Sequence, residues 1–219
     1  NAVKGIDVFI DGHSHSDLEA VKAATGGTGK VGSALLTSTG TKLANIGCVV
    51  ISKDGITAST IPTAELTVTP NKTVAARAAA IQKQIDDDYG AVFAKTTYEL
   101  NGAKAPNGNR DGETNLGDLI TDALVWGAKQ NGEAVDAAVT NGGGIRATIK
   151  AGDITKKDVN TVLPFGNTLS IVKVTGTELL EALEASTYCT PDALGGFPQV
   201  SGIMFTVDTA KAYDAGSLY

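Results

Sequence analysis

The residues best suited to bind a charged ligand lie in one short segment, NGGGIR at 141–146. The segment follows an apolar run at 137–140 that predicts a buried strand. Three glycines after a strand allow backbone turns with positive φ and a close approach of the backbone to a ligand. Asn141 can bond its own turn or a ligand hydroxyl, and Arg146 offers a planar fork of donors for phosphate or carboxylate. The alternative is an ordinary glycine turn with a solvated arginine.

The only two histidines, His13 and His15, come directly after an apolar run at 6–10 that predicts a buried strand. Residues two apart in an extended segment point to the same side, so both imidazoles could face one point. The end of a strand is a usual ligand position in an α/β sheet, and neutral imidazole binds zinc and similar ions. The pair therefore indicates part of a metal site, and two exposed loop histidines without an ion are the alternative.

Periodicity and turn signals predict the elements that position these residues. Further strands are expected at 34–36, 46–51, 56–61, 94–100 and 203–207, with a hairpin turn at 52–55. Cys48 lies in an apolar run, which predicts a buried thiol.

Helices are predicted from caps and apolar stripes. Asn71 is expected to cap an amphipathic helix that ends at Gly90, although Asn71-Lys72-Thr73 is also an N-glycan acceptor sequence. A second helix is expected from Leu116 onward. Two capping boxes, Thr155 with Asp158 and Thr175 with Glu178, predict two more helix starts.

The composition limits the classes of function. A chain of 219 residues with 42% hydrophobic and 19% charged residues is ordinary for one or two globular domains. The net charge of −6 provides no general basic field for nucleic acid, so an anionic ligand would need local arginines, of which there are three: Arg77, Arg110 and Arg146. No apolar run approaches the roughly 20 residues of a membrane span, and no signal peptide is visible in this segment.

Further motifs stand in a fixed order around the glycine segment. Arg110 and ETNLGDLITDA at 113–123 precede it, and VLPFGN at 162–167 and GGFPQVSG at 195–202 follow it. As an ordered set, from about Arg110 to Asp208, these motifs resemble the C-terminal domain of the 5′-nucleotidase family. The segment DGHSHS at 11–16 resembles the last metal-ligand motif of the metallophosphoesterase domain in the same family.

The resemblance implies an α/β chain with mixed α+β sheets in three parts. Residues 1–66 would be the C-terminal part of a metallophosphoesterase β-sandwich domain. Residues 67–93 would form an interdomain linker helix. Residues 94–219 would be most of a nucleotide-binding C-terminal α/β domain, truncated before its end.

The resemblance also implies a function, a 5′-nucleotidase that hydrolyses nucleoside 5′-phosphates such as AMP with two divalent ions, zinc or manganese. His13 would bind one ion and His15 the other, and Phe165 would be one of two rings that sandwich the base. Contacts to the nucleoside or its phosphates would come from Arg110, Asn141, Gly143, Gly144 and Arg146. The intact protein would be secreted, periplasmic or attached to the cell surface.

The chain departs from the family in what it lacks. The upstream metal motifs, the catalytic histidine and the second base-stacking aromatic ring are absent, so no catalytic residue is assigned and the chain is expected to be an internal fragment that is inactive alone. Its expected partner is the missing N-terminal metal-binding part of the same protein. The alternatives are a 2′,3′-cyclic-nucleotide 2′-phosphodiesterase/3′-nucleotidase of the same family and a non-catalytic nucleotide-binding surface module.

Overall fold

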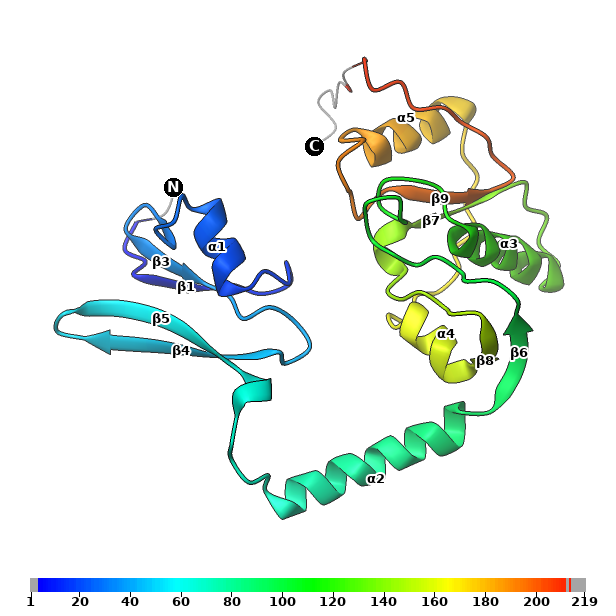
Figure 1. Cartoon of the computed structure of the whole chain (residues 1–219). Helices are drawn as coiled ribbons and strands as arrows, with labels where there is room; N and C mark the ends of the chain where they lie inside the picture. The colour runs from blue at the N-terminus through cyan, green and yellow to red at the C-terminus, as the bar shows by residue number, and fades with distance from the viewer. Residues whose placement is uncertain (1–3, 212, 214–219) are drawn as a thin grey trace. The chain divides into compact units, whose positions relative to one another are not determined.

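The computed structural model describes residues 4–211 and 213. The chain divides into two compact units, residues 1–75 and 76–219. Helix α2 (Lys72–Tyr89) crosses the division (Figure 1). Each unit has its own small sheets and its own packing, and each is described by itself.

The first unit holds a three-stranded sheet and a hairpin. The sheet has the order β1 (Val8–Ile10), β3 (Ala34–Thr37), β2 (Lys30–Val31), with β1 parallel and β2 antiparallel to β3. Helix α1 (Leu18–Ala24) is capped by Asp17, whose Oδ1 accepts a 2.8 Å bond from the Ala20 amide. The hairpin pairs β4 (Asn45–Ser52) with β5 (Gly55–Pro62) through the predicted turn, and the short helix η1 (Thr63–Glu65) follows it.

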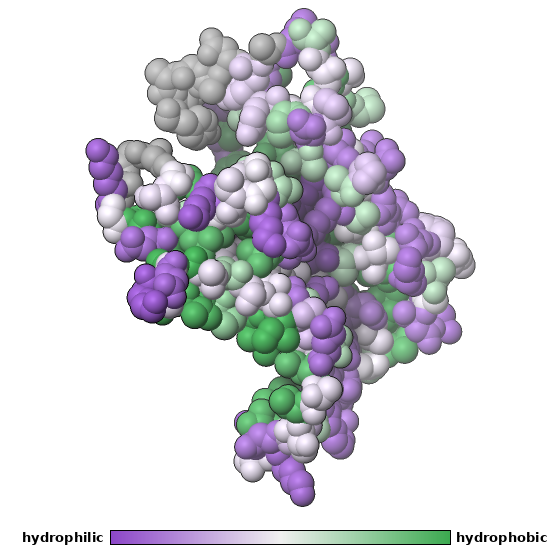
Figure 2. Space-filling view, turned by 60° about the vertical axis from the view of Figure 1, so that its left-hand side comes forward, coloured by the Kyte–Doolittle hydropathy of each residue, from purple (hydrophilic) through white to green (hydrophobic). Residues whose placement is uncertain are grey.

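Two burial predictions in this unit are wrong. Phe9 and Ile10 of β1 are exposed, and so are Cys48 and its neighbours Val50 and Ile51 in β4. Neither β1 nor β4 contributes a buried residue, so packing against the described residues leaves these side chains uncovered. Apolar side chains are visible on the molecular surface (Figure 2).

Helix α2 confirms the capping prediction. The Asn71 side-chain oxygen accepts bonds from the amides of Thr73 (3.0 Å) and Val74 (3.2 Å). No residue of the helix is buried, so the predicted apolar stripe lies exposed. An ion pair of 2.6 Å between Asp86 and Lys157 joins the helix to the chain before Val162, within the second unit.

Beyond α2, the described residues of the second unit form two antiparallel strand pairs and the helices that pack on or follow them. Strand β6 (Val92–Thr96) pairs with β8 (Gly152–Thr155), and β7 (Ala138–Asn141) pairs with β9 (Pro198–Ser201). Helix α3 (Asn115–Gln130) packs on β7 and β9. The apolar core consists of Leu100, Leu116, Ile145, Ile149, Ile154 and Val162.

Both predicted capping boxes are confirmed. Thr155 caps α4 (Lys156–Val162) with Asp158, and Thr175 caps α5 (Gly176–Thr187) with Glu178. The strand predicted at 203–207 is wrong, because the chain turns at Gly202 (φ +76°) and the paired strand is β9, immediately before it. Among the described residues, no helix is both long and apolar enough to cross a membrane.

Candidate functional site

The glycine segment forms a tight turn between two other loops. Strand β7 ends at Asn141, and Gly142–Gly144 form the single-turn 3₁₀ helix η2. The Gly142 amide donates to the Phe197 carbonyl (2.7 Å), and the Gly143 amide donates to the Gly195 carbonyl (2.8 Å). The segment GGFPQVSG therefore packs directly against the glycine turn.

The prediction of positive φ at these glycines is wrong, because none of the three adopts it. Gly142 and Gly143 are required by lack of space instead. A Cβ atom on Gly142 would overlap the Asn109 carbonyl, and one on Gly143 would lie 2.7 Å from the Gly195 oxygen. Glycine thus allows three backbone segments to approach one another closely.

Asn141 holds the turn from its other side. Its side-chain amide donates a 3.1 Å bond to the Gly195 carbonyl, the same oxygen that accepts the Gly143 amide. The residue is exposed, so its side chain lies at the surface of the site.

Arg146 connects the glycine turn to Phe165. Its Nη1 donates a 3.0 Å bond to the Gly143 carbonyl, and its guanidinium carbon lies 5.5 Å from the centre of the Phe165 ring. Its amide donates to the Val162 carbonyl at 2.9 Å, which fixes the chain three residues before the ring. Phe165 remains 59% exposed, so it can stack a second planar group.

Arg110 is the second arginine of the site, in addition to Arg146. It lies in a loop before α3, where its carbonyl accepts a 2.8 Å bond from the Leu194 amide. Its Nε is buried and has no hydrogen-bond partner among the described residues. Burial and the nearby charge of Arg146 both lower the pKa of Arg110, so the two guanidinium groups act on the same region.

The second unit therefore brings together the six predicted ligand-binding residues. Two half-buried arginines, a largely exposed aromatic ring and a close-packed backbone turn converge on one surface. Such a set suits a ligand with a planar apolar group and an anionic group.

The predicted metal ligands lie in the first unit. His13 and His15 are exposed, with φ of 67° and 62°, so the tripeptide is not the extended segment from which their convergence was predicted. Among residues 4–211 and 213, no group of three or more His, Cys, Asp or Glu side chains could hold a metal ion. These residues alone do not complete a metal shell.

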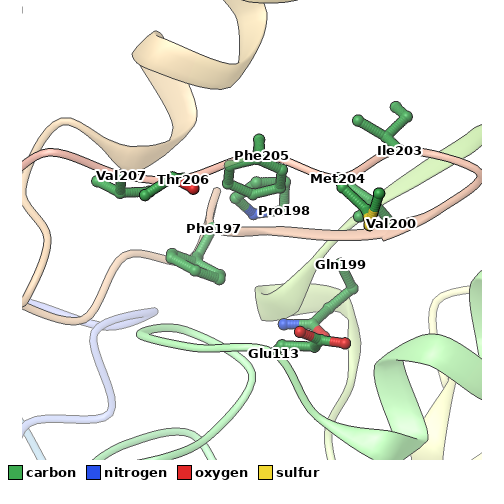
Figure 3. Close-up of a pocket in the computed structure, with 10 residues that line it drawn as sticks. All are labelled: Glu113, Phe197, Pro198, Gln199, Val200, Ile203, Met204, Phe205, Thr206 and Val207. Atoms are coloured by element: carbon green, nitrogen blue, oxygen red, sulfur yellow. The ribbon is translucent and has the colours of Figure 1, made fainter.

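A separate groove of about 640 Å³ runs along β9 (Figure 3). Glu113 and Gln199 give it a polar floor, and apolar side chains such as Phe205 and Met204 line the rest. None of the predicted site residues lines it.

Sequence reasoning missed the buried polar residues behind the site. Asn109, Thr114 and Gln199 are almost fully buried and bonded to one another. Their partners are up to 90 positions apart in the sequence, so no local motif reveals them.

Comparisons with known proteins agree with this fold. Residues 92–216 match the family described as 5′-nucleotidase, C-terminal domain. The trifunctional nucleotide phosphoesterase protein YfkN of Bacillus subtilis (strain 168) is 34% identical over 209 residues, which cover 93% of this chain and 14% of that protein. A 5′-nucleotidase of Vibrio parahaemolyticus is 43% identical over 99 residues, which cover 45% of this chain and 17% of that protein.

A solved structure extends the likeness to three dimensions. The crystal structure of a 5′-nucleotidase precursor from Thermus thermophilus aligns with a TM-score of 0.62 and 29% identity, covering 90% of this chain and 41% of that chain. The chain thus spans less than half the length of each of these relatives. Because the family match covers more than half of the chain, we conclude that it belongs to the 5′-nucleotidase family, whose C-terminal domain it carries at residues 92–216.

Proposed function

We propose that this chain is a segment of a 5′-nucleotidase, which hydrolyses nucleoside 5′-phosphates to nucleoside and phosphate, and that its second unit binds the substrate. The observation that carries the proposal is the buried Nε of Arg110, which lacks a partner among the described residues and lies within the electrostatic influence of Arg146. A buried donor without an acceptor is costly. A ligand oxygen would supply the acceptor, and a dianionic phosphate would offset the repulsion between the arginines.

The remaining residues have distinct roles in this proposal. Phe165 stacks the base on the ring face that Arg146 leaves open. Asn141, Gly143 and Gly144 shape the turn that holds Arg146 and approach the nucleoside. The contribution of this unit to catalysis is thus positioning, because it fixes the substrate relative to reactive groups outside it.

The metal assignment is also a proposal. We propose that His13 and His15 contribute to a site for two zinc or manganese ions in the intact protein, with further ligands from parts of the protein outside this chain. When bound, such ions would neutralise charge on the phosphate. Replacing both histidines by alanine in the intact protein should lower the metal stoichiometry measured by elemental analysis. An unchanged stoichiometry would reject the assignment.

The name of the Bacillus relative supports a second candidate activity. That protein is described as a trifunctional nucleotide phosphoesterase, a name that covers more than one phosphoesterase activity. The alternative activity is hydrolysis of 2′,3′-cyclic nucleotides, which the family resemblance of the sequence motifs also allows. A non-catalytic nucleotide-binding module is the third possibility, and it would bind AMP without releasing phosphate.

One assay separates these functions. The intact protein is incubated with zinc or manganese and either AMP or 2′,3′-cyclic AMP, and the products are measured. Phosphate release from AMP that falls in the Arg110→Lys variant supports the proposal. Turnover of the cyclic substrate alone supports the alternative, and binding without turnover supports the module. The 219-residue chain by itself should release no phosphate above a variant with both His13 and His15 replaced by alanine.

The proposed location of the intact protein is outside the cytoplasm, either secreted, periplasmic or at the cell surface. The description of the Thermus relative as a precursor is consistent with processing during export. Activity measured on intact cells, and compared with lysed cells, tests this proposal.

A further inference from the structure

Gln199 is a buried polar residue beside the candidate nucleotide site, with only 1% of its surface exposed. It lies on β9, and its side chain points from the strand toward the loop that carries Glu113 (Figure 3). Glutamine is rarely buried to this extent unless its amide is fully hydrogen-bonded. Its partners therefore show what the residue holds in place.

The Gln199 amide holds three backbone groups that flank Arg110. Nε2 donates to the carbonyl of Asn109 (3.2 Å) and to the carbonyl of Gly112 (2.8 Å). Oε1 accepts from the amide of Thr114 (3.1 Å). One side chain thus fixes the backbone on both sides of Arg110, in a loop that has no strand or helix of its own.

The same residue connects this loop to the glycine turn. Gln199 pairs with Thr140 in the β7–β9 ladder, and β7 ends one residue later at Asn141, directly before η2. The Asn109 carbonyl of the Arg110 loop lies directly against Gly142 of the turn, and only the absence of a side chain at Gly142 allows this approach. Gln199 therefore sits between the loop of Arg110 and the turn that positions Arg146.

The surroundings fit an amide of this length. Gly117 in the first turn of α3 leaves room for it, because a Cβ there would overlap the Gln199 amide oxygen. Thr114 Oγ1 caps the same helix at the Gly117 amide (3.0 Å) and donates to Asn109 Oδ1 (2.7 Å). An apolar residue of the same size would leave the buried Asn109 carbonyl and the buried Thr114 amide without their Gln199 partner, and would also remove the partner of the partly buried Gly112 carbonyl.

We propose that Gln199 is a positioning residue that sets the placement of Arg110 relative to Arg146 and thereby controls affinity for the anionic part of a nucleotide. The proposal rests on the nucleotide binding proposed above. Gln199 does not itself touch the ligand and acts only through Arg110.

The test is a double-mutant cycle on the intact protein, with a non-hydrolysable AMP analogue as the probe. Gln199→Met should weaken binding about tenfold, as expected for a displaced charge-assisted contact. In the Arg110→Lys background the same change should add little, because the contact is already impaired. The control is Thr121→Val, since Thr121 is as deeply buried but bonds only to carbonyls of α3. Thr121→Val should leave the affinity for the AMP analogue unchanged even if the variant protein is less stable.

The measured affinities of these variants decide whether Gln199 positions Arg110. Wild-type affinity in folded Gln199→Met overturns the proposal, and so do additive losses in the double variant, which would indicate general destabilisation. If the methionine variant does not fold, Gln199→Asn replaces it, because the shorter amide cannot span all three partners and should also weaken binding. Wild-type affinity in that variant overturns the proposal. If the wild-type protein binds no nucleotide, the proposed function fails, and this role fails with it.

Discussion

The guanidinium carbon of Arg146 lies 5.5 Å from the centre of the Phe165 ring, and the same guanidinium donates to the Gly143 carbonyl. Arg146 thereby links the glycine turn, the proposed phosphate-binding arginines and the proposed base-stacking ring. A substitution in any one of these three parts should therefore alter the position of the other two. This coupling makes the site testable one residue at a time.

Phe165→Ala should weaken nucleotide use while sparing a small chromogenic phosphate ester. Base stacking on an aromatic ring contributes about 1–3 kcal/mol, and the small ester has no base to stack. The measurement compares kcat/KM for AMP and for the ester in the intact protein, with Phe165→Trp as the control that keeps a ring. Equal losses on both substrates would identify Phe165 as a packing residue.

Arg110→Lys and Arg146→Lys should each weaken binding of a non-hydrolysable nucleotide. Lysine keeps the charge but loses the planar fork, and at position 146 it also loses the bond to Gly143 and the stacking on Phe165. Arg77→Lys is the matched control, because Arg77 is exposed on α2. Titration of the three variants decides the matter, and the interpretation fails if the Arg77 variant binds as weakly as the other two.

Two Gly→Ala changes should have opposite effects on stability. Gly142→Ala would force a methyl group into the Asn109 carbonyl and should cost about 1–3 kcal/mol. Gly127→Ala lies in α3 with open space around the new Cβ, and it should stabilise by up to about 1 kcal/mol through higher helix propensity. Denaturant unfolding of both variants measures the difference. Equal destabilisation would contradict the packing at Gly142.

Thr155→Ala should destabilise the protein by about 1 kcal/mol, because it removes the N-cap of α4, the helix that leads to Phe165. Thr155→Ser keeps the hydroxyl and should stay close to wild type. Denaturant midpoints at neutral pH test the pair, and a loss in Thr155→Ser equal to that in Thr155→Ala would exclude the cap as the cause.

The same capping box makes a pH prediction. Hydrogen bonds from the side chain and then the backbone of Thr155 lower the pKa of Asp158. A carboxylate with a depressed folded-state pKa stabilises above its unfolded-state pKa, and this stabilisation is lost as pH falls through the folded-state value. Thr155→Ala should therefore show a smaller loss of stability in acid than wild type. If the free energy of unfolding falls equally with pH in the two proteins, the hydrogen bonds of Asp158 to Thr155 are not the source of the acid sensitivity.

Local signals predicted the helices well, because a cap and an apolar stripe are both encoded within a few residues. Asn71, Thr155 and Thr175 each begin a helix with the predicted side-chain bonds. The capping boxes are visible in the sequence because the reciprocal bonds connect positions only three apart.

Predictions about burial and backbone conformation were less successful, because they depend on distant neighbours. The run at 6–10 is apolar, yet Phe9 and Ile10 have no covering layer among the described residues. The glycines of η2 were expected to provide positive φ, whereas the approach of Asn109 and Gly195 explains them. The buried amide of Gln199 could not be predicted, because its partners lie 85–90 positions away.

The β4–β5 hairpin has a consequence for handling the chain in the laboratory. Each strand pairs only with the other among the described residues, so each has an edge free to pair again, beside exposed Val50 and Ile51. Such edges act as templates for strands from other molecules. The isolated chain should therefore self-associate increasingly with concentration, and light scattering should accompany any binding measurement made on it.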